Sequence, residues 1–184
     1  SVLSTVWAAV GAVATLVLYV GVYTPAKRVT SLCVLIGAVP GALPPVIGWA
    51  AGGGSLALHA WLLFALVFVW QLPHFATIAW LYRDDYARAG YPMLPVIDPV
   101  GIRTDLHLIT HSIMLITVST LPVVYGMAGS WYLCCAIVSG TAFLAFGIVF
   151  VVRKTPTCAR MHVIASVSHL LLLCVIMVLD KTYP

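Results

Sequence analysis

The sequence has 184 residues, of which 62% are apolar and 8% charged, with a formal net charge of +4 and a mean hydropathy of +1.10. Because soluble domains carry about 25% charged residues, this composition excludes an ordinary soluble domain. It predicts one polytopic membrane domain over residues 1–184, embedded in the lipid bilayer and with no nucleic-acid partner.

Six apolar segments follow one another along the chain, each close to the roughly 20 residues that a helix needs to cross a bilayer. A helix satisfies its backbone hydrogen bonds within one segment, whereas a barrel would need alternating segments of about ten residues. The segments are 3–23, 31–50, 57–80, 106–125, 131–152 and 162–179. We therefore predict an all-α membrane protein with six transmembrane helices.

The loops between these segments differ in charge. All basic residues except Lys181 follow the first, third and fifth segments. They are Lys27, Arg28, Arg83, Arg88, Arg103, Arg153, Lys154 and Arg160. Since basic loops stay on the cytoplasmic side of a membrane, this face is predicted to be cytoplasmic. The longest loop, residues 81–105, lies on it, and long ordered loops are often functional.

Prolines fall within two of the apolar segments. Pro40, Pro44 and Pro45 lie in the second segment and Pro73 lies in the third. Such breaks are tolerated where the freed carbonyls face protein or a water-filled cavity, so we expect interrupted helices around a pocket open to the cytoplasm. Aromatic side chains of these segments can line such a pocket or simply pack. They are Trp49, Trp61, Phe64, Phe68, Trp70, Phe75 and Trp80.

A dense charged patch follows the third segment. Asp84 and Asp85 are adjacent and are flanked by Arg83 and Arg88. Mg²⁺ is commonly held by one or two carboxylates, with water and substrate phosphates completing its shell. The patch therefore predicts a Mg²⁺ site, and a solvated pair of loop charges is the alternative.

A basic stretch, residues 23–30, lies on the same predicted face. Lys27 and Arg28, together with the hydroxyl of Thr24, can hold a phosphate group. Basic residues also flank cytoplasmic helix ends merely to set topology. If both clusters are functional, Mg²⁺ from one side and cations from the other would enclose a diphosphate.

The histidines and cysteines give weaker signals. His74 is an ionisable group inside an apolar segment, which makes it a candidate for function, with a satisfied core histidine as the alternative. His107 and His111 are spaced to share one helix face but lack a third metal ligand. His59, His162 and His169 are expected to be structural. The five cysteines form no C-x-x-C pair and are expected to be small buried hydrophobes.

Four short strings follow one another along the chain. They are Tyr23-Thr-Pro-x-Lys-Arg-x-Thr30, Gly41-Ala-x-Pro-Pro-x-x-Gly-Trp49, Trp70-Gln-x-Pro-His-Phe75 and Asp85-Tyr-x-x-Ala-Gly-x-x-Met-Leu-Pro95. In this order they resemble the UbiA superfamily of membrane prenyltransferases and, within it, the haem O synthase (protohaem IX farnesyltransferase) family. The similarity extends over nearly the whole chain, including the tail 159–181.

The resemblance implies a nine-helix bundle around a central cavity in the bacterial inner membrane, with helices four to nine in this chain. It implies Mg²⁺ as cofactor, farnesyl diphosphate and haem b as substrates, and transfer of the farnesyl group to a haem vinyl group, followed by addition of water. Haem A synthase or terminal oxidase assembly factors are the implied protein partners.

The resemblance implies that Asp84 and Asp85 bind the Mg²⁺ ion. It implies that Lys27 and Arg28 lie beside the diphosphate and neutralise its charge. Further substrate-binding residues are Tyr23, Thr24, His74, Tyr82, Arg83, Tyr86 and Arg88. Tyr82 and Tyr86 replace acidic residues of other superfamily members, Cys33 replaces an expected asparagine, and His162 and His169 replace aromatics.

The first aspartate-rich motif of the family is expected to precede Ser1. The chain begins inside an apolar segment without the features of a signal peptide. We therefore expect an N-terminally incomplete chain that is inactive by itself. The alternative functions are a UbiA-type prenyltransferase with an aromatic acceptor, a non-catalytic haem-binding membrane subunit, and a transporter.

Overall fold

The computed structural model describes residues 2–53 and 58–182, and within them six helices are long and apolar enough to cross a membrane. The long helices are α1 (Val2–Val17), α3 (Cys33–Ala51), α4 (Leu58–Leu81), α7 (Ile102–Val124), α8 (Ser130–Arg153) and α9 (Pro156–Leu179). A π-helical turn η1 (Leu18–Tyr23) and α2 (Thr24–Ala26) extend α1, while α5 (Arg83–Arg88) and α6 (Leu94–Ile97) are short. The predicted all-α membrane fold is confirmed.

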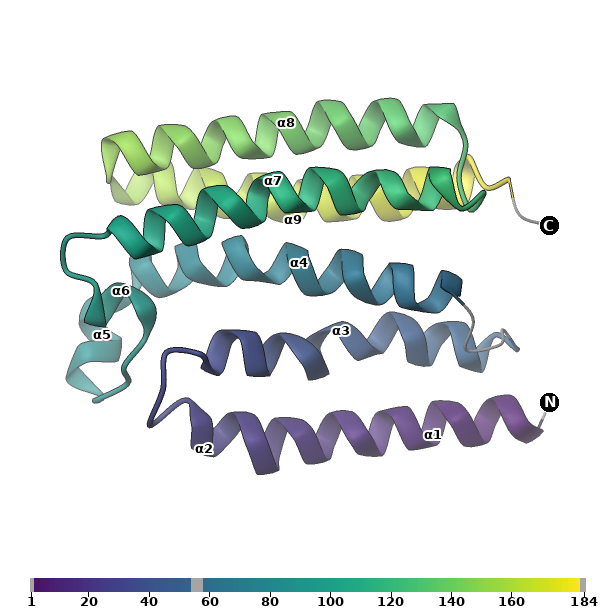
Figure 1. The fold of residues 1–184 in the computed structure, drawn as a ribbon, viewed down its shortest axis with the longest axis horizontal. Helices are drawn as coiled ribbons and strands as arrows, with labels where there is room; N and C mark the ends of the chain where they lie inside the picture. Colours follow the sequence, from purple (N-terminus) through teal and green to yellow (C-terminus); the bar gives the residue numbers. More distant parts are fainter. Residues whose placement is uncertain (1, 54–57, 183–184) are drawn as a thin grey trace.

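The long helices lie side by side, with α1, α3 and α4 forming one side of the molecule and α7, α8 and α9 the other (Figure 1). Helix α4 joins the two sides, because it packs against α3, α7 and α9. Its burial reflects this position: Leu66, Val69 and Leu72 are each 2% exposed. A core cluster forms where α4 meets α7, α8 and α9, with Leu115 and Phe143 at its centre.

The loops after α2, α4 and α8 all emerge at one end of the bundle, together with α5 and α6 (Figure 1). We call this the charged end, because the residues of all three charged loops lie there. The opposite end contains the α7–α8 turn and the carboxyl end of α9, where Asp180 accepts a hydrogen bond from the backbone N–H of Tyr132. The separation of charges expected from the sequence is therefore present in the fold. Part of the uncharged connection between α3 and α4, residues 54–57, lies outside the described residues.

The prediction of interrupted helices is wrong. Helix α3 continues through Pro40, Pro44 and Pro45, and α4 continues through Pro73. Each proline removes one backbone donor, and helix packing in the membrane tolerates that loss. Pro40 and Pro73 are buried against neighbouring helices. The cavity described below therefore has another origin.

Helix boundaries also differ from the expected segments. Helix α9 begins at Pro156, six residues before the expected start, because the Thr155 side chain accepts a hydrogen bond from the backbone N–H of Cys158 and caps the helix. Helix α7 begins at Ile102, because Asp98 accepts hydrogen bonds from the backbone N–H and hydroxyl of Thr104. The long loop 81–105 is partly helical, since it contains α5 and α6.

Buried polar pairs join α9 to its neighbours. His74 of α4 lies 2.6 Å from the Ser166 hydroxyl, Thr77 lies 2.8 Å from Nδ1 of His162, and Ser139 of α8 lies 2.8 Å from Nδ1 of His169. Because each of these hydroxyls donates to a backbone carbonyl in its own helix, each Nδ1 carries the proton and donates. His162 and His169 thus join α9 to α4 and α8.

The cysteines correct one expectation. Cys33 and Cys158 are buried, but Cys134 and Cys174 are exposed on the outer surface of α8 and α9. Both helices have the composition of membrane spans. An apolar sequence around a cysteine therefore indicates a position that is compatible with lipid, but it does not indicate burial within the protein.

Candidate functional site

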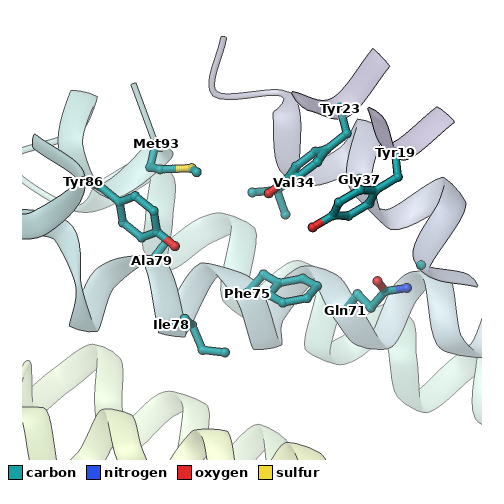
Figure 2. A pocket seen from close by; sticks show the side chains of 11 residues that line it. Tyr19, Tyr23, Val34, Gly37, Gln71, Phe75, Ile78, Ala79, Tyr86 and Met93 are labelled. Atoms are coloured by element: carbon teal, nitrogen blue, oxygen red, sulfur yellow. The ribbon is translucent and has the colours of Figure 1, made fainter. Parts of the chain in front are cut away.

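A cavity of about 220 Å³ lies near the charged end, between η1, α3, α4 and α5. Figure 2 shows its side chains. They are Tyr19, Tyr23, Val34, Gly37, Gly41, Gln71, Phe75, Ile78, Ala79, Tyr86 and Met93. Its wall is mostly apolar and contains the rings of three tyrosines and a phenylalanine. We call it the aromatic cavity.

Two glycines make room for this cavity. A Cβ on Gly37 would lie 2.8 Å from the Tyr23 ring, and a Cβ on Gly41 would lie 2.2 Å from Oε1 of Gln71. These glycines are four residues apart and so share one face of α3. The Tyr23 ring and the Gln71 amide can therefore lie directly against the α3 backbone. The close packing at this cavity therefore depends on the absence of side chains at two glycines of α3. It does not depend on broken helices, which the sequence had suggested.

The basic stretch and the charged loop meet at the mouth of the aromatic cavity. Nζ of Lys27 lies 5.9 Å from the Tyr23 ring centroid and 5.8 Å from that of Tyr91. Sγ of Cys33 lies 3.6 Å from Sδ of Met93, so the segment before α6 also packs on α3. The structure thus brings a cation, two tyrosines and the α5–α6 connection together.

Tyr86 contributes a neutral phenol to the cavity wall. Burial, together with the nearby Cys33 and Tyr82, raises the pKa of Tyr86 above its ordinary value. Its hydroxyl therefore keeps its proton at physiological pH and can donate a hydrogen bond to an anionic ligand.

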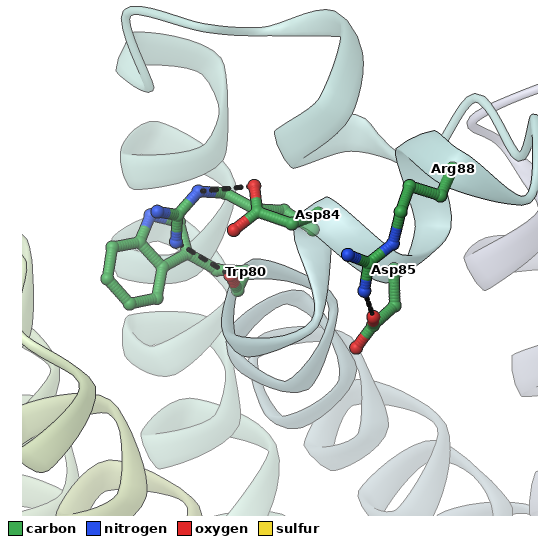
Figure 3. Close-up of polar contacts among 5 residues, drawn as sticks. Trp80, Asp84, Asp85 and Arg88 are labelled. Atoms are coloured by element: carbon green, nitrogen blue, oxygen red, sulfur yellow. Dashed lines mark hydrogen bonds and ion pairs between the residues drawn. The ribbon is translucent and has the colours of Figure 1, made fainter.

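The predicted metal ligands lie on α5 beside the cavity and not inside it. Asp84 and Asp85 are in the first turn of α5, with side chains 83% and 60% exposed. Oδ1 of Asp84 lies 3.8 Å from Nε of Arg83, whereas Asp85 pairs with Arg88. Figure 3 shows the two carboxylates pointing in different directions, as expected for neighbours in a helix of 3.6 residues per turn.

These residues fit a hydrated Mg²⁺ that is bound together with a phosphate ligand. Such a site uses one or two carboxylates, and both aspartates are open to solvent. Across residues 2–53 and 58–182, no cluster of three or more His, Cys, Asp or Glu side chains could hold a metal ion alone. His107 and His111 have ring centroids 4.1 Å apart but accordingly do not complete a metal site there.

A second cavity of about 500 Å³ lies on the other side of the wall formed by α5 and the end of α4. Arg83, Asp84 and Lys154 line it. Arg83 is fixed there, because its guanidinium lies 4.5 Å from the Trp80 ring centroid and donates to the Trp80 carbonyl. Lys154 pairs with Asp105. This cavity is polar and more exposed than the aromatic cavity.

The predicted site residues are therefore distributed over several positions. Tyr23 and Tyr86 line the aromatic cavity, whereas Arg83 and Asp84 line the second cavity. The other predicted residues of the charged end line neither of these two cavities. They are Thr24, Lys27, Arg28, Tyr82, Asp85 and Arg88.

Two predicted substrate contacts lie in positions that favour other roles. The hydroxyl of Thr24 donates to the carbonyl of Tyr19, one helical turn earlier. His74 stacks on Trp70 and contacts Ser166 of α9, on a different side of α4 from the aromatic cavity. Its position explains why it is buried without lining the cavity.

Sequence reasoning assigned no role to several residues that line the aromatic cavity. Tyr19 lies outside the four matched strings, although its spacing of four residues from Tyr23 places both rings on one side of a helix. Gly41 and Gln71 begin or lie within matched strings, yet neither was assigned a role. Their function depends on a contact between two helices, which no local pattern reveals.

Comparison with known proteins places this geometry in a family. The profile of the UbiA prenyltransferase family matches residues 1–176. A protein named protoheme IX farnesyltransferase from Solibacter usitatus is 46% identical over 167 residues, which cover 91% of this chain and 57% of the relative. Proteins of the same name from Koribacter versatilis and Opitutus terrae are each 41% identical, over 93% and 90% of this chain and 57% and 56% of the relatives.

This chain thus spans a little over half the length of these relatives. No solved structure matches it. The family profile extends over both predicted clusters, all of the aromatic cavity and nearly all of the long helices. With six membrane-compatible helices and this match, the chain belongs to the UbiA prenyltransferase family.

Proposed function

We propose that this chain carries the cavity and part of the diphosphate site of an enzyme that transfers a farnesyl group to a vinyl group of haem b. One observation carries the proposal: an aromatic cavity opens beside Lys27 and the carboxylates of α5. The names of the relatives support the acceptor and the donor. The family match supports prenyl transfer.

In this proposal the diphosphate of the donor lies at the mouth of the aromatic cavity. Asp84 and Asp85 would hold Mg²⁺, which neutralises the diphosphate and makes it a better leaving group. Lys27, Arg28 and Arg88 add positive charge from the protein, and stabilisation of the charge that develops in the transition state is commonly the largest catalytic effect. The Tyr86 hydroxyl donates a hydrogen bond to the departing group.

The aromatic cavity would hold the prenyl chain away from water. When the C1–O bond breaks, the bonding pair leaves with the diphosphate, and an allylic cation remains near the mouth, beside the Tyr23 ring. Aromatic faces stabilise a cation in such a place. The vinyl group of haem then bonds to C1, water adds to the resulting cation, and one proton is released to solvent.

The position of His74 changes its proposed role. Because it contacts α9 and does not line the aromatic cavity, we assign it to positioning α4 against α9 and not to contact with haem. Haem b would approach the prenyl chain from the side of the mouth.

We place the charged end in the cytoplasm of a bacterial inner membrane, because basic loops stay on the side where the chain is made and the relatives are bacterial proteins. Haem A synthase or an oxidase assembly factor is the proposed protein partner, since either would receive the farnesylated product.

A segment exchange tests the function. The matching part of the Solibacter usitatus relative is replaced by this chain, and membranes with the hybrid are given labelled farnesyl diphosphate with haem b or with 4-hydroxybenzoate. We expect label in haem and none in the benzoate. A folded hybrid that prenylates only the benzoate would refute the haem assignment. A hybrid that binds haem stoichiometrically but transfers no prenyl group would indicate a haem-binding subunit.

A further inference from the structure

The aromatic cavity has two distinct ends along α4. Figure 2 shows Tyr86 and Met93 at one end and Gln71 at the other, with Phe75 between them. Tyr86 and Met93 belong to the charged end, so the opposite end lies deeper in the bundle. From Ala79 to Gln71, α4 advances about 12 Å at 1.5 Å per residue. We take this distance along α4 as the length available to a chain that enters at the mouth.

At the deep end, α4 contacts α3 through Gln71 and Gly41. Oε1 of Gln71 lies where a Cβ on Gly41 would be only 2.2 Å away. Gln71 is 4% exposed, and its Nε2 donates to the carbonyls of Val67, at 3.2 Å, and Ala38, at 3.4 Å. The amide is therefore held between the two helices and forms a fixed end wall.

This end wall matches one class of ligand. Extended chains advance roughly 3.6 Å for every three backbone bonds. On the same scale, main chains of prenyl groups with 10, 15 and 20 carbons span roughly 8, 13 and 18 Å. A depth of about 12 Å therefore suits the 15-carbon group. A longer chain would have to displace an amide whose lost hydrogen bonds would be left unpaired in an apolar site.

Building on the proposed prenyl-donor site, we infer that the contact between Gly41 and Gln71 determines the length of the prenyl chain that this protein accepts. Gly41 sets the position of the Gln71 amide, and the amide ends the cavity behind the third isoprene unit. Both are specificity-determining residues, because neither lies at the mouth where the diphosphate would react.

The test is binding of geranyl, farnesyl and geranylgeranyl diphosphate, with Mg²⁺, to the purified segment-exchange hybrid in detergent, because this chain carries only part of the proposed diphosphate site. The hybrid with the wild-type chain is expected to prefer the 15-carbon ligand. In Gly41→Ala the new methyl group pushes the amide into the cavity, so affinity for the 15-carbon ligand should fall at least about tenfold relative to the 10-carbon ligand. Gly48→Ala is the matched control on the same helix, because a Cβ there meets nothing within 4 Å.

A second pair of variants tests the opposite direction. Gln71→Ala removes the end wall, and we expect the 20-carbon ligand to gain at least about tenfold relative to the 15-carbon ligand. Gln71→Leu keeps the bulk but removes the hydrogen bonds that hold the amide, so its length preference should lie between those of the wild type and Gln71→Ala. Circular dichroism and monodispersity establish that each variant is folded, and Gln71→Ala alone suffices if Gly41→Ala fails this check.

The outcomes separate this inference from the function on which it rests. If the hybrid with the wild-type chain binds prenyl diphosphates and both Gly41→Ala and Gln71→Ala keep its length preference, the inference is overturned and the donor site stands. If the folded hybrid without these substitutions binds none of the three ligands, the donor site is wrong and the inference falls with it.

Discussion

Adjacent carboxylates need not act together, as Asp84 and Asp85 show. The two side chains leave α5 in different directions and pair with different arginines. Asp84 lines the second cavity, whereas Asp85 pairs with Arg88 and lines neither cavity. A Mg²⁺ ion bound through water to one of them would therefore depend on the two carboxylates unequally.

Replacing one carboxylate tests the metal assignment. In the segment-exchange hybrid, Asp85→Asn removes a negative ligand while keeping its size, and we expect prenyl transfer to slow at least about 100-fold. The rate is measured at saturating and at limiting Mg²⁺, since a lost ligand should also raise the Mg²⁺ requirement. Asp180→Asn, the same change at the opposite end, should leave the rate unchanged. Normal transfer by Asp85→Asn would remove Asp85 from the metal site.

The carboxylate of Asp98 stabilises the fold and is distinct from the proposed metal ligands Asp84 and Asp85. Desolvation tends to raise its pKa, but hydrogen bonds from Thr104, Gly101 and Arg103 together lower the pKa below its ordinary value. A carboxyl group with a lowered pKa in the folded state stabilises the fold above its unfolded-state pKa. This contribution is lost as pH falls through the folded-state pKa.

Asp98→Ala should therefore destabilise the protein by about 1 kcal/mol near neutral pH, because the backbone N–H and hydroxyl of Thr104 lose their hydrogen-bond acceptor. The difference from the wild type should shrink as the pH is lowered below the ordinary aspartate range. Unfolding in mixed detergent, followed by circular dichroism at several pH values, measures it. A difference that stays constant down to acidic pH would show that the charge of Asp98 contributes nothing.

Helix α8 illustrates how an element depends on small residues. A Cβ on Gly147 would lie 2.9 Å from Cδ2 of Leu108 and 3.2 Å from Nε2 of His162. The neighbouring helices α7 and α9 approach α8 at this point, because a glycine offers only backbone. Membrane helices associate through such close contacts, since lipid is as apolar as their side chains.

Gly147→Ala is expected to destabilise the bundle by about 1–3 kcal/mol through overpacking. Gly48→Ala makes the same change of helix propensity at an open position, so the difference between the two variants isolates the packing effect. Thermal unfolding in detergent provides the measurement. Equal stability of the two variants would mean that α7 and α9 can move away from α8 at little cost.

Element boundaries show where local sequence is informative. Hydropathy located all six long helices, because a membrane span must be apolar over its whole length. It missed the first turn of α9, where Thr157 and Arg160 dilute the apolar signal, although Thr155 and Pro156 form a recognisable start. It also overestimated the effect of prolines in α3 and α4, since tertiary packing keeps those helices continuous.

At the scale of the whole molecule, the two ends of the bundle differ sharply in charge. Lys27, Arg83 and Lys154 come from three separate loops that meet at one end (Figure 1). Two loops lie on the same side of a membrane only if the chain crosses it an even number of times between them. Successive basic loops here are separated by two of the six spans, so all three loops lie on one side. The same topology brings the basic stretch against Tyr91 of the next charged loop.

Single-cysteine labelling tests this topology in intact cells. In a cysteine-free background, Arg88→Cys should be protected from a membrane-impermeant maleimide until the cells are opened, because we place it in the cytoplasm. Ser130→Cys, at the opposite end, should react in intact cells. The reverse pattern would invert the orientation and would place the diphosphate site on the wrong side for a substrate made in the cytoplasm.

The sequence by itself determined the fold class, the number of spans and the gathering of charge at one end. These properties follow from composition and from the length of apolar segments, and both are local. It also identified Tyr23, Lys27 and the aspartates of α5 as candidates, because short motifs and charge placement mark them without any knowledge of packing.

Only the tertiary structure decided which of these residues share a cavity. It placed Arg83 and Asp84 on one side of a wall and Tyr86 on the other, and it turned His74 toward α9. It also brought Gln71 of α4 against Gly41 of α3 in the lining of the aromatic cavity. The reason is physical: a cavity is bounded by side chains from several helices, and their contacts depend on how the helices pack.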